Sequence, residues 1–208
     1  MRIKTFQTGV LGANCHIVIN DGEALIIDLG GDYATVRDYL KKEKVTPLAV
    51  LLTHGHFDHI EGVIDAQKEL PVYVFEREKK FLNDVSLNLA NEIGGFQKGE
   101  ITEVVTFTEG NLKIGSFDVK VIHTPGHTSG SCCFLIENAL FSGDTLFKNG
   151  FGRYDLPTGD FKSLTRSVYR LIHDLDESVT VYTGHGESTT IKEERINNSL
   201  YNYVKDKF

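Results

Sequence analysis

Short apolar or alternating runs, which are typical of β-strands, recur along the chain and are separated by turn residues. In the first half they predict strands over residues 2–6, 15–19, 24–27, 48–52 and 72–75. Asn20-Asp21-Gly22 joins two of these runs and predicts a hairpin, because Asp-Gly accepts positive φ. A second block predicts strands over residues 104–107, 111–114, 117–122, 132–136 and 139–141.

Apolar residues three or four positions apart predict helices between and after these strand blocks. The expected helices cover residues 33–44, a segment beginning near His59, 77–91, 162–173 and 190–205. Asp58, with Glu61 three residues later, is expected to cap the helix near His59, and Thr190 with Glu193 forms a second capping box. Residues 93–99, which are rich in glycine, predict a loop that could overhang a site.

Strand and helix blocks occur twice in succession, so we expect an α/β fold in which two sheets pack face to face with helices outside. We expect residues 1–208 to form a single domain, because the length suits one core and no linker interrupts the pattern. The strand order does not follow from this periodicity.

Composition narrows the classes of partner and compartment. The 208 residues are 40% hydrophobic and 25% charged, as in an ordinary globular protein. A formal net charge of -7, without a long basic run, argues against nucleic acid as the main partner. No signal segment and no run of membrane-spanning length are recognised, so we expect a cytoplasmic protein without a membrane partner. Cys15, Cys132 and Cys133, an odd number within apolar runs, indicate buried thiols in a reducing compartment.

The stretch from Thr53 to His59 carries three histidines and an aspartate directly behind an apolar run. In an extended chain His54 and His56 share a face and can reach one metal ion. Asp58 and His59 are adjacent and can serve a second ion only if the chain turns there, which the expected helix provides. Imidazole and carboxylate ligands suit zinc, and iron and manganese accept similar sets. The alternative, exposed histidines beside a helix cap, is disfavoured by the density of the cluster.

Three further candidate ligands each follow a strand run and lie beside glycine, which permits tight turns around a metal pocket. They are His127, Asp144 and His185. Seven ligands exceed the need of one zinc ion, so we expect two ions that share a bridging carboxylate and a water activated as hydroxide. Asp144 is the expected bridge. We assign His54, His56 and His127 to the first ion and Asp58, His59 and His185 to the second.

Five motifs resemble, in order, those of the metallo-beta-lactamase superfamily and, within it, the small hydroxyacylglutathione hydrolase (glyoxalase II)-like proteins. They are Thr-His-Gly-His-Phe-Asp-His (53–59), Thr-Pro-Gly-His-Thr-Ser-Gly (124–130), Ser-Gly-Asp-Thr-Leu-Phe (142–147), Gly-Phe-Gly-Arg-Tyr-Asp (150–155) and Thr-Gly-His-Gly (183–186). The resemblance implies a four-layer αββα sandwich with the metals at one edge of the two sheets. It also supports the ligand assignment position by position.

The resemblance implies hydrolysis of thioesters such as S-lactoylglutathione by a metal-bridging hydroxide, in a dinuclear metallohydrolase. A thiolate of pKa about 8.5 leaves with little help from a proton, so this chemistry requires no dedicated general acid. We expect Asp58 to have a secondary catalytic role in orienting or deprotonating the water. An amide leaving group would need proton delivery, which disfavours lactam cleavage.

Two departures from the longer family members concern the thiol. Those enzymes have a helical C-terminal extension that completes the glutathione site, whereas one helix is expected after His185 here. Arg153 stands where they carry a lysine; it is either a bidentate contact for a substrate carboxylate or part of a surface ion pair. The expected partner is therefore a small-molecule thioester, and the sequence does not specify its thiol. It does not specify the oligomeric state either.

Two readings from other classes compete. A persulfide dioxygenase uses a related fold with a single iron, and a complete second ligand set counts against it. A non-catalytic metal-binding module is disfavoured because every ligand position is filled. His16, within a strand, and His173, near a helix end, are interpreted as structural.

Overall fold

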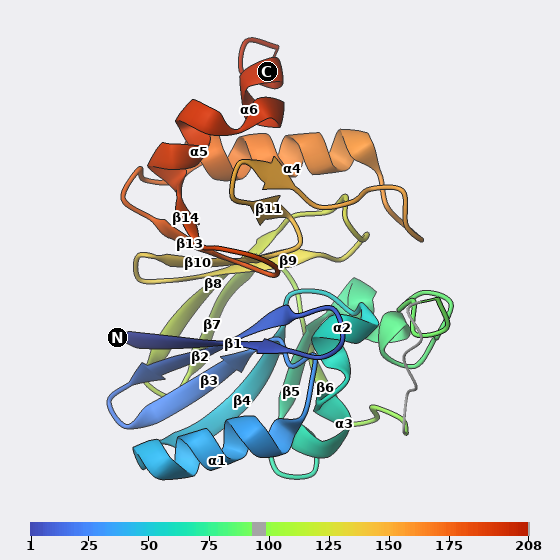
Figure 1. Cartoon of the computed structure of the whole chain (residues 1–208), viewed down its shortest axis with the longest axis vertical. Helices are drawn as coiled ribbons and strands as arrows, with labels where there is room; N and C mark the ends of the chain where they lie inside the picture. The colour runs from blue at the N-terminus through green and yellow to red at the C-terminus, as the bar shows by residue number, and fades with distance from the viewer. Residues whose placement is uncertain (93–98, 208) are drawn as a thin grey trace.

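Two six-stranded sheets lie face to face between two helical layers in the computed structural model, which describes residues 1–92 and 99–207 (Figure 1). The first sheet contains, in spatial order, β1 (Arg2–Thr8), β2 (Ala13–Asn20), β3 (Glu23–Ile27), β4 (Thr46–Leu52), β5 (Val72–Phe75) and β6 (Val104–Phe107). The second contains β14 (Thr189–Thr190), β13 (Thr180–Thr183), β10 (Ala139–Gly143), β9 (Cys132–Ile136), β8 (Phe117–His123) and β7 (Gly110–Ile114). A small hairpin is formed by β11 (Leu146–Phe147) and β12 (Gly150–Phe151).

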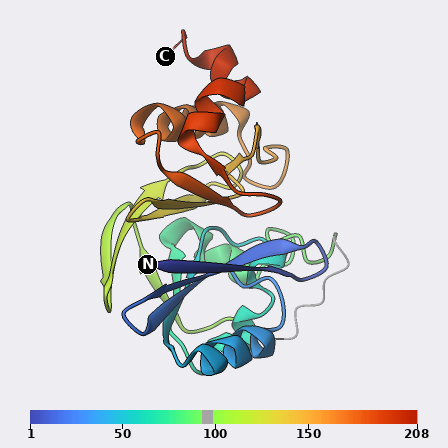
Figure 2. The same cartoon turned by 60° about the vertical axis from the view of Figure 1, so that its left-hand side comes forward.

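Helices cover the outer face of each sheet, as Figures 1 and 2 show. On the first sheet lie α1 (Tyr33–Glu43) and α3 (Val63–Ala66), and on the second lie α4 (Phe161–Asp174), α5 (Ile191–Asn197) and α6 (Ser199–Val204). The expected α/β sandwich with four αββα layers is therefore confirmed. None of the helices in the described residues is long and apolar enough to cross a membrane.

Three apolar cores hold the four layers together, and strand alternation explains why. Along β2, Cys15 and Ile17 contribute to the core beneath the first helical layer, whereas Val18 contributes to the core between the sheets. A strand covered on both faces reads as a continuous apolar run, since successive side chains point to opposite sides. The third core lies between the second sheet and α4, whose Leu164 and Val168 are fully buried.

Local sequence signals account for several connections. The β2–β3 hairpin turns at Asp21 and Gly22, which both adopt positive φ (47° and 78°), as the Asp-Gly pair predicts. Thr190 caps α5 by accepting a hydrogen bond from Glu193 N at 3.1 Å, which confirms the cap, while the Glu193 carboxylate accepts from Thr189 Oγ1 at 3.0 Å. The last helix does not run through to 205, because Asn198 interrupts it and caps α6.

Two helix predictions need correction. The helix expected over 77–91 is a 3₁₀ helix, η1 (Glu76–Leu82), followed by turns. Asp84 ends it, because its carboxylate accepts bonds from Ser86 N and Leu87 N and so competes with the helical backbone. The loop expected over 93–99 falls, except for Gly99, outside the described residues.

The helix expected near His59 is split into α2 (Phe57–Ile60) and α3. Its N-cap is His56, without a side-chain cap bond, and not Asp58. The Asp58 carboxylate instead approaches His185 Nε2 at 3.1 Å, so the prediction of a capping role was wrong.

Candidate metal centre

The candidate ligands all lie just beyond strand ends, where the two sheets meet at one edge. His54 and His56 follow β4, and Asp58 and His59 belong to α2. From the second sheet, His127 follows β8, Asp144 follows β10 and His185 follows β13. The carboxyl ends of β-strands are a common position for functional side chains, because loops there are free to vary while the sheets hold their origins fixed.

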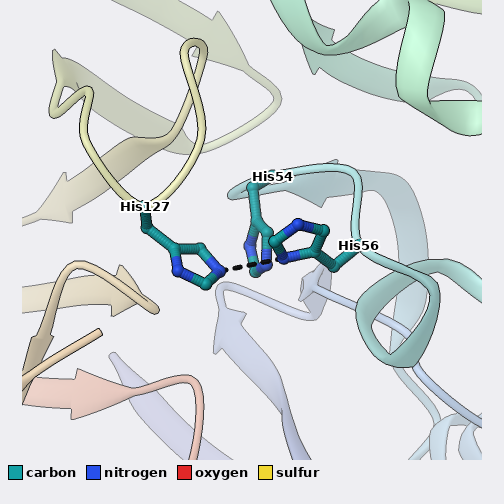
Figure 3. A group of neighbouring side chains, drawn as sticks. All are labelled: His54, His56 and His127. Carbon is teal, nitrogen blue, oxygen red and sulfur yellow. Dashed lines mark hydrogen bonds between the residues drawn. The ribbon is translucent and has the colours of Figure 1, made fainter. Parts of the chain in front are cut away.

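His54, His56 and His127 form the first group, and their rings converge on one point (Figure 3). One ligand atom from each lies within 4.8 Å of the others, and His56 Nδ1 is 2.9 Å from His127 Nε2. All three side chains are buried. His127 uses Nδ1 for the Arg153 carbonyl, so in the metal-free protein its Nε2 accepts a hydrogen bond from His56 Nδ1. The same two nitrogens could bind one ion once that proton is displaced.

Asp58, His59 and His185 form the second group, again within 4.8 Å. Asp58 Oδ2 lies 3.1 Å from His185 Nε2 and 3.7 Å from His59 Nε2, and the two ring nitrogens are 3.4 Å apart. The His185 side chain is 29% exposed, against 0% for His59, so the centre opens to solvent on the His185 side.

Asp144 lies between the groups. Its Oδ2 is 3.6 Å from His127 Nε2 and 3.7 Å from His185 Nε2, while its Oδ1 is 3.4 Å from His59 Nε2. One carboxylate thus faces members of both groups, which is the position that a bridging ligand requires. Gly184 makes room for it, because a Cβ on Gly184 would stand 2.1 Å from Asp144 Oδ1.

A buried hydrogen-bond chain orients two of the histidines. Thr53 Oγ1 donates to Asp28 Oδ2 at 2.7 Å and so accepts from the Nδ1–H of His54 at 3.1 Å. His59 donates from Nδ1 to the same Asp28 oxygen at 2.9 Å. Both imidazoles therefore turn Nε2 toward the centre, as metal-binding histidines do when the other nitrogen is held by a carboxylate or carbonyl.

His127 is oriented in the same manner by the main chain, since its Nδ1 donates to the carbonyl of Arg153 at 2.8 Å. Gly152, the preceding residue, packs against the Asp144 carbonyl so closely that a Cβ there would stand 1.8 Å from the oxygen. The main chain of Gly152 and Arg153 therefore supports the site, because it packs against Asp144 and supplies the carbonyl that orients His127. The Arg153 side chain lies at the surface, where it forms two 2.9 Å hydrogen bonds with the Asp155 carboxylate.

Asp28 was not among the residues predicted for the site. It follows β3 with positive φ (56°), a conformation that is strained for a residue with a Cβ and that recurs at functional sites. Its Oδ1 also accepts from Thr53 N at 2.8 Å, which ties the ends of the parallel neighbours β3 and β4 together. Its only sequence signal is an aspartate directly after an apolar strand run; the pairing of that strand with β4 is known from the structure alone.

The electrostatics differ between the two groups. Burial, assisted by the neighbouring histidines, lowers the pKa of His54 well below its ordinary value. Burial acts in the same direction on His59, but Asp58, Asp144 and Asp28 outweigh it and hold the pKa of His59 well above the ordinary value. Burial would raise the pKa of Asp144, yet His59 and His127 hold it well below the usual range. The ionised carboxylates therefore draw a positive charge to this point.

The donor set fits divalent metal ions. His54 Nε2 is buried without a hydrogen-bond partner, and Asp144 Oδ1 has none beyond its 3.4 Å ion pair with His59 Nε2; such atoms are costly unless they have another use. Both atoms point into the cluster of nitrogen and oxygen donors, and coordination of a cation would satisfy them.

Comparison with known proteins agrees with this chemistry. The family model described as "Metallo-beta-lactamase superfamily" matches residues 8–185. The "Probable metallo-hydrolase YqgX" of Bacillus subtilis is 36% identical over 208 residues, covering 97% of this chain and 98% of the relative. The "Hydroxyacylglutathione hydrolase GloC" of Haemophilus influenzae is 29% identical over 97% of this chain and 99% of its own length.

Two solved structures share the whole architecture. The "BLEG-1 B3 metallo-beta-lactamase" superposes with a TM-score of 0.88 at 38% identity, covering 96% of this chain and 99% of the other. "TTHA1623 in a di-iron-bound form" superposes with a TM-score of 0.86 at 32% identity, covering 94% and 98%.

Proposed function

The chain belongs to the metallo-beta-lactamase superfamily and is a metal-dependent hydrolase; we propose that it is a dinuclear thioesterase that cleaves 2-hydroxyacyl thiol conjugates such as S-lactoylglutathione. The observation that carries the proposal is the position of Asp144, whose two oxygens face members of both ligand groups. A relative described as a hydroxyacylglutathione hydrolase, aligned over 97% of this chain, supports the choice of substrate class.

In this proposal His54, His56 and His127 would hold one ion, Asp58, His59 and His185 would hold the other, and Asp144 would serve both. Zinc suits this mixture of imidazole and carboxylate, and the di-iron form of TTHA1623 makes iron the first alternative. Divalent ions bound there would polarise an ester carbonyl and lower the pKa of a water molecule.

The protein's own groups have separate tasks. His59 and His185 hold the pKa of Asp58 below its ordinary value despite burial, so its carboxylate is ionised and able to orient or accept a proton from the nucleophilic water. Substrate reaches the centre on the His185 side, where Phe147 packs against the imidazole with ring centroids 6.2 Å apart. The leaving thiolate needs little proton transfer, so these groups suffice for a thioester.

Arg153 is proposed as a contact for a carboxylate of the substrate. Its carbonyl orients His127, and its exposed guanidinium is held by Asp155, a partner that a substrate carboxylate would have to displace. A planar guanidinium binds carboxylates through two parallel hydrogen bonds.

Metal analysis combined with a substrate panel tests the proposal. Protein loaded with zinc should hold two ions per chain and hydrolyse S-lactoylglutathione, and His56→Ala should abolish turnover. Thioesters of other small thiols, assayed in parallel, identify the thiol. A metal-loaded protein that leaves every thioester intact would refute the thioesterase; a single bound iron with oxygen consumption on a persulfide would point to the dioxygenase.

Hydrolysis of β-lactams is the second candidate, because a structure of 38% identity is described as a B3 metallo-beta-lactamase. The same preparation should be assayed with a chromogenic cephalosporin. Turnover of the cephalosporin above that of every thioester would reverse the order of the two candidates.

A further inference from the structure

Glu78 is a fully buried carboxylate that lies outside the candidate ligand set. It belongs to η1, whose neighbouring residues Arg77 and Lys79 are exposed. An ionised carboxylate is rarely buried unless hydrogen bonds compensate for its lost hydration. Its contacts therefore indicate what the residue is for.

Glu78 accepts three hydrogen bonds of 2.8 Å, and they come from two different loops. Its Oε2 accepts from Gly55 N, and its Oε1 accepts from Gly130 N and Thr128 Oγ1. Gly55 stands between His54 and His56, and Thr128 follows His127. One side chain therefore ties the loop of the first sheet to the loop of the second at the point where the first ligand group is assembled.

Two glycines allow the carboxylate to come this close. A Cβ on Gly130 would stand 2.6 Å from Glu78 Oε1, and a Cβ on Gly55 would stand 3.3 Å from Oε2 and 2.4 Å from Phe81 Cβ. Burial raises the pKa of Glu78 to about 6, so at neutral pH both oxygens are ionised acceptors. Charge-assisted bonds of this type hold their donors more rigidly than neutral ones.

The second ligand group is supported from another place. Asn14 donates from Nδ2 to Thr183 O at 2.9 Å and to Gly186 O at 3.0 Å, and from its main-chain N to Gly184 O at 2.7 Å. These bonds hold the segment that carries His185. Glu78 and Asn14 thus each hold the loops of one group only, whereas the buried chain through Asp28 reaches His54 in the first group and His59 in the second.

We propose that Glu78 is the positioning residue of the His54–His56–His127 site, and that it sets the affinity of this site for a divalent cation separately from the Asp58–His59–His185 site. The inference rests on the proposed metal centre. Asn14 has the corresponding role for the second site.

Glu78→Gln tests the proposal with a minimal change. Glutamine keeps the shape, but its amide nitrogen is a donor and faces Gly55 N or Gly130 N wherever it is placed, so at least one of these two main-chain bonds is lost. Changes to groups that orient metal ligands typically cost about 10- to 100-fold in affinity. We expect a loss of this size for one of two zinc ions in a calorimetric titration of the metal-free chain, and for the other ion in Asn14→Ala.

Glu194→Gln is the matched control. Glu194 is also fully buried, and it accepts hydrogen bonds from Asn149 N, Thr189 Oγ1 and Asn198 Nδ2, none of which belongs to a candidate ligand. The same chemical change should lower resistance to urea in both variants but leave both zinc affinities intact in Glu194→Gln. A merely structural role for Glu78 predicts that the two variants behave alike.

A readout without metal completes the test. In the metal-free wild-type protein, the His127 Nδ1 proton bonded to Arg153 O should give a slowly exchanging imidazole signal by NMR. We expect Glu78→Gln to broaden it and Glu194→Gln to preserve it. An unchanged signal together with unchanged zinc affinities, or an equal loss at both zinc sites, would overturn the proposal. Neither readout uses turnover, so failure of thioester hydrolysis would refute the thioesterase alone.

Discussion

His16 should make the stability of the metal-free protein depend on pH in a defined direction. It lies on β2, buried between the sheets, where Nδ1 is 2.9 Å from Thr5 Oγ1 and Nε2 donates to Thr183 O at 3.1 Å. Burial lowers the pKa of His16 from 6.5 to about 4, although the bond to Thr183 opposes the shift. The unfolded chain therefore takes up a proton before the folded one does.

The sign follows from proton linkage. Above about pH 6.5 His16 is neutral in both the folded and the unfolded state, and its contribution to the free energy of unfolding is complete. As the pH falls toward about 4, the unfolded state gains protons and the free energy of unfolding decreases. A shift from 6.5 to about 4 corresponds to a loss of about 2 kcal/mol by pH 5 and about 3 kcal/mol by pH 4.

His16→Gln removes the titration while an amide can keep both hydrogen bonds. The free energy of unfolding of both proteins is measured by urea unfolding followed by circular dichroism. The titrations are made at several pH values in the presence of a chelator, so that both proteins are metal-free. The other titrating groups are common to both and cancel in the difference. Between about pH 7.5 and pH 5 the wild type should lose about 2 kcal/mol more than the variant. A difference that does not change with pH would refute the reasoning.

Three further outcomes are expected. Gly184→Ala should lower the metal content per chain, because its Cβ would stand 2.1 Å from Asp144 Oδ1, whereas Gly150→Ala, with no atom nearer than 3.9 Å, should retain it; equal contents would contradict this. Leu164→Ala should lower the free energy of urea unfolding by about 3 kcal/mol, because it removes a fully buried side chain. Ile196→Ala, at a side chain that is 65% exposed, should lower it by less than about 0.5 kcal/mol. Similar losses in the two variants would be evidence against the assigned core. A chelator should lower the free energy of unfolding, and zinc at about 100 times its Kd should restore about 2.7 kcal/mol; no shift would mean that the folded state does not bind zinc preferentially.

The sequence predicted the sandwich and the meeting of the candidate ligands for the same physical reason. Each ligand follows an apolar strand, and strand ends within packed sheets lie at a common edge. The turn chemistry at Asp21-Gly22 and the cap at Thr190 are local, so they too could be predicted. The strand order within each sheet could not, because periodicity describes faces and not neighbours.

The residues that support the site escaped prediction because their partners are distant in sequence. Glu78 reaches Thr128 and Gly130 from 50 and 52 positions away, and Asn14 reaches Thr183 from 169. An isolated acid or amide shows no spacing signal. The capping role of Asp58, unlike its place in the second ligand group, was predicted wrongly, because a helix-capping pattern is local and was overridden by the contact with His185.

The division of each ligand group between the two sheets has a consequence for synthesis. His56 and His127 are 71 positions apart, and His59 and His185 are 126 apart. An ion bound at either group would join the two sheets, much as a cross-link does. A nascent chain that stops before the last ligand of a group lacks part of that site. The first site cannot form before His127 has left the ribosome, nor the second before His185. The first ion could therefore be bound while the chain beyond His127 is still being made, whereas binding of the second would require residues 59–185 and the packing of both sheets.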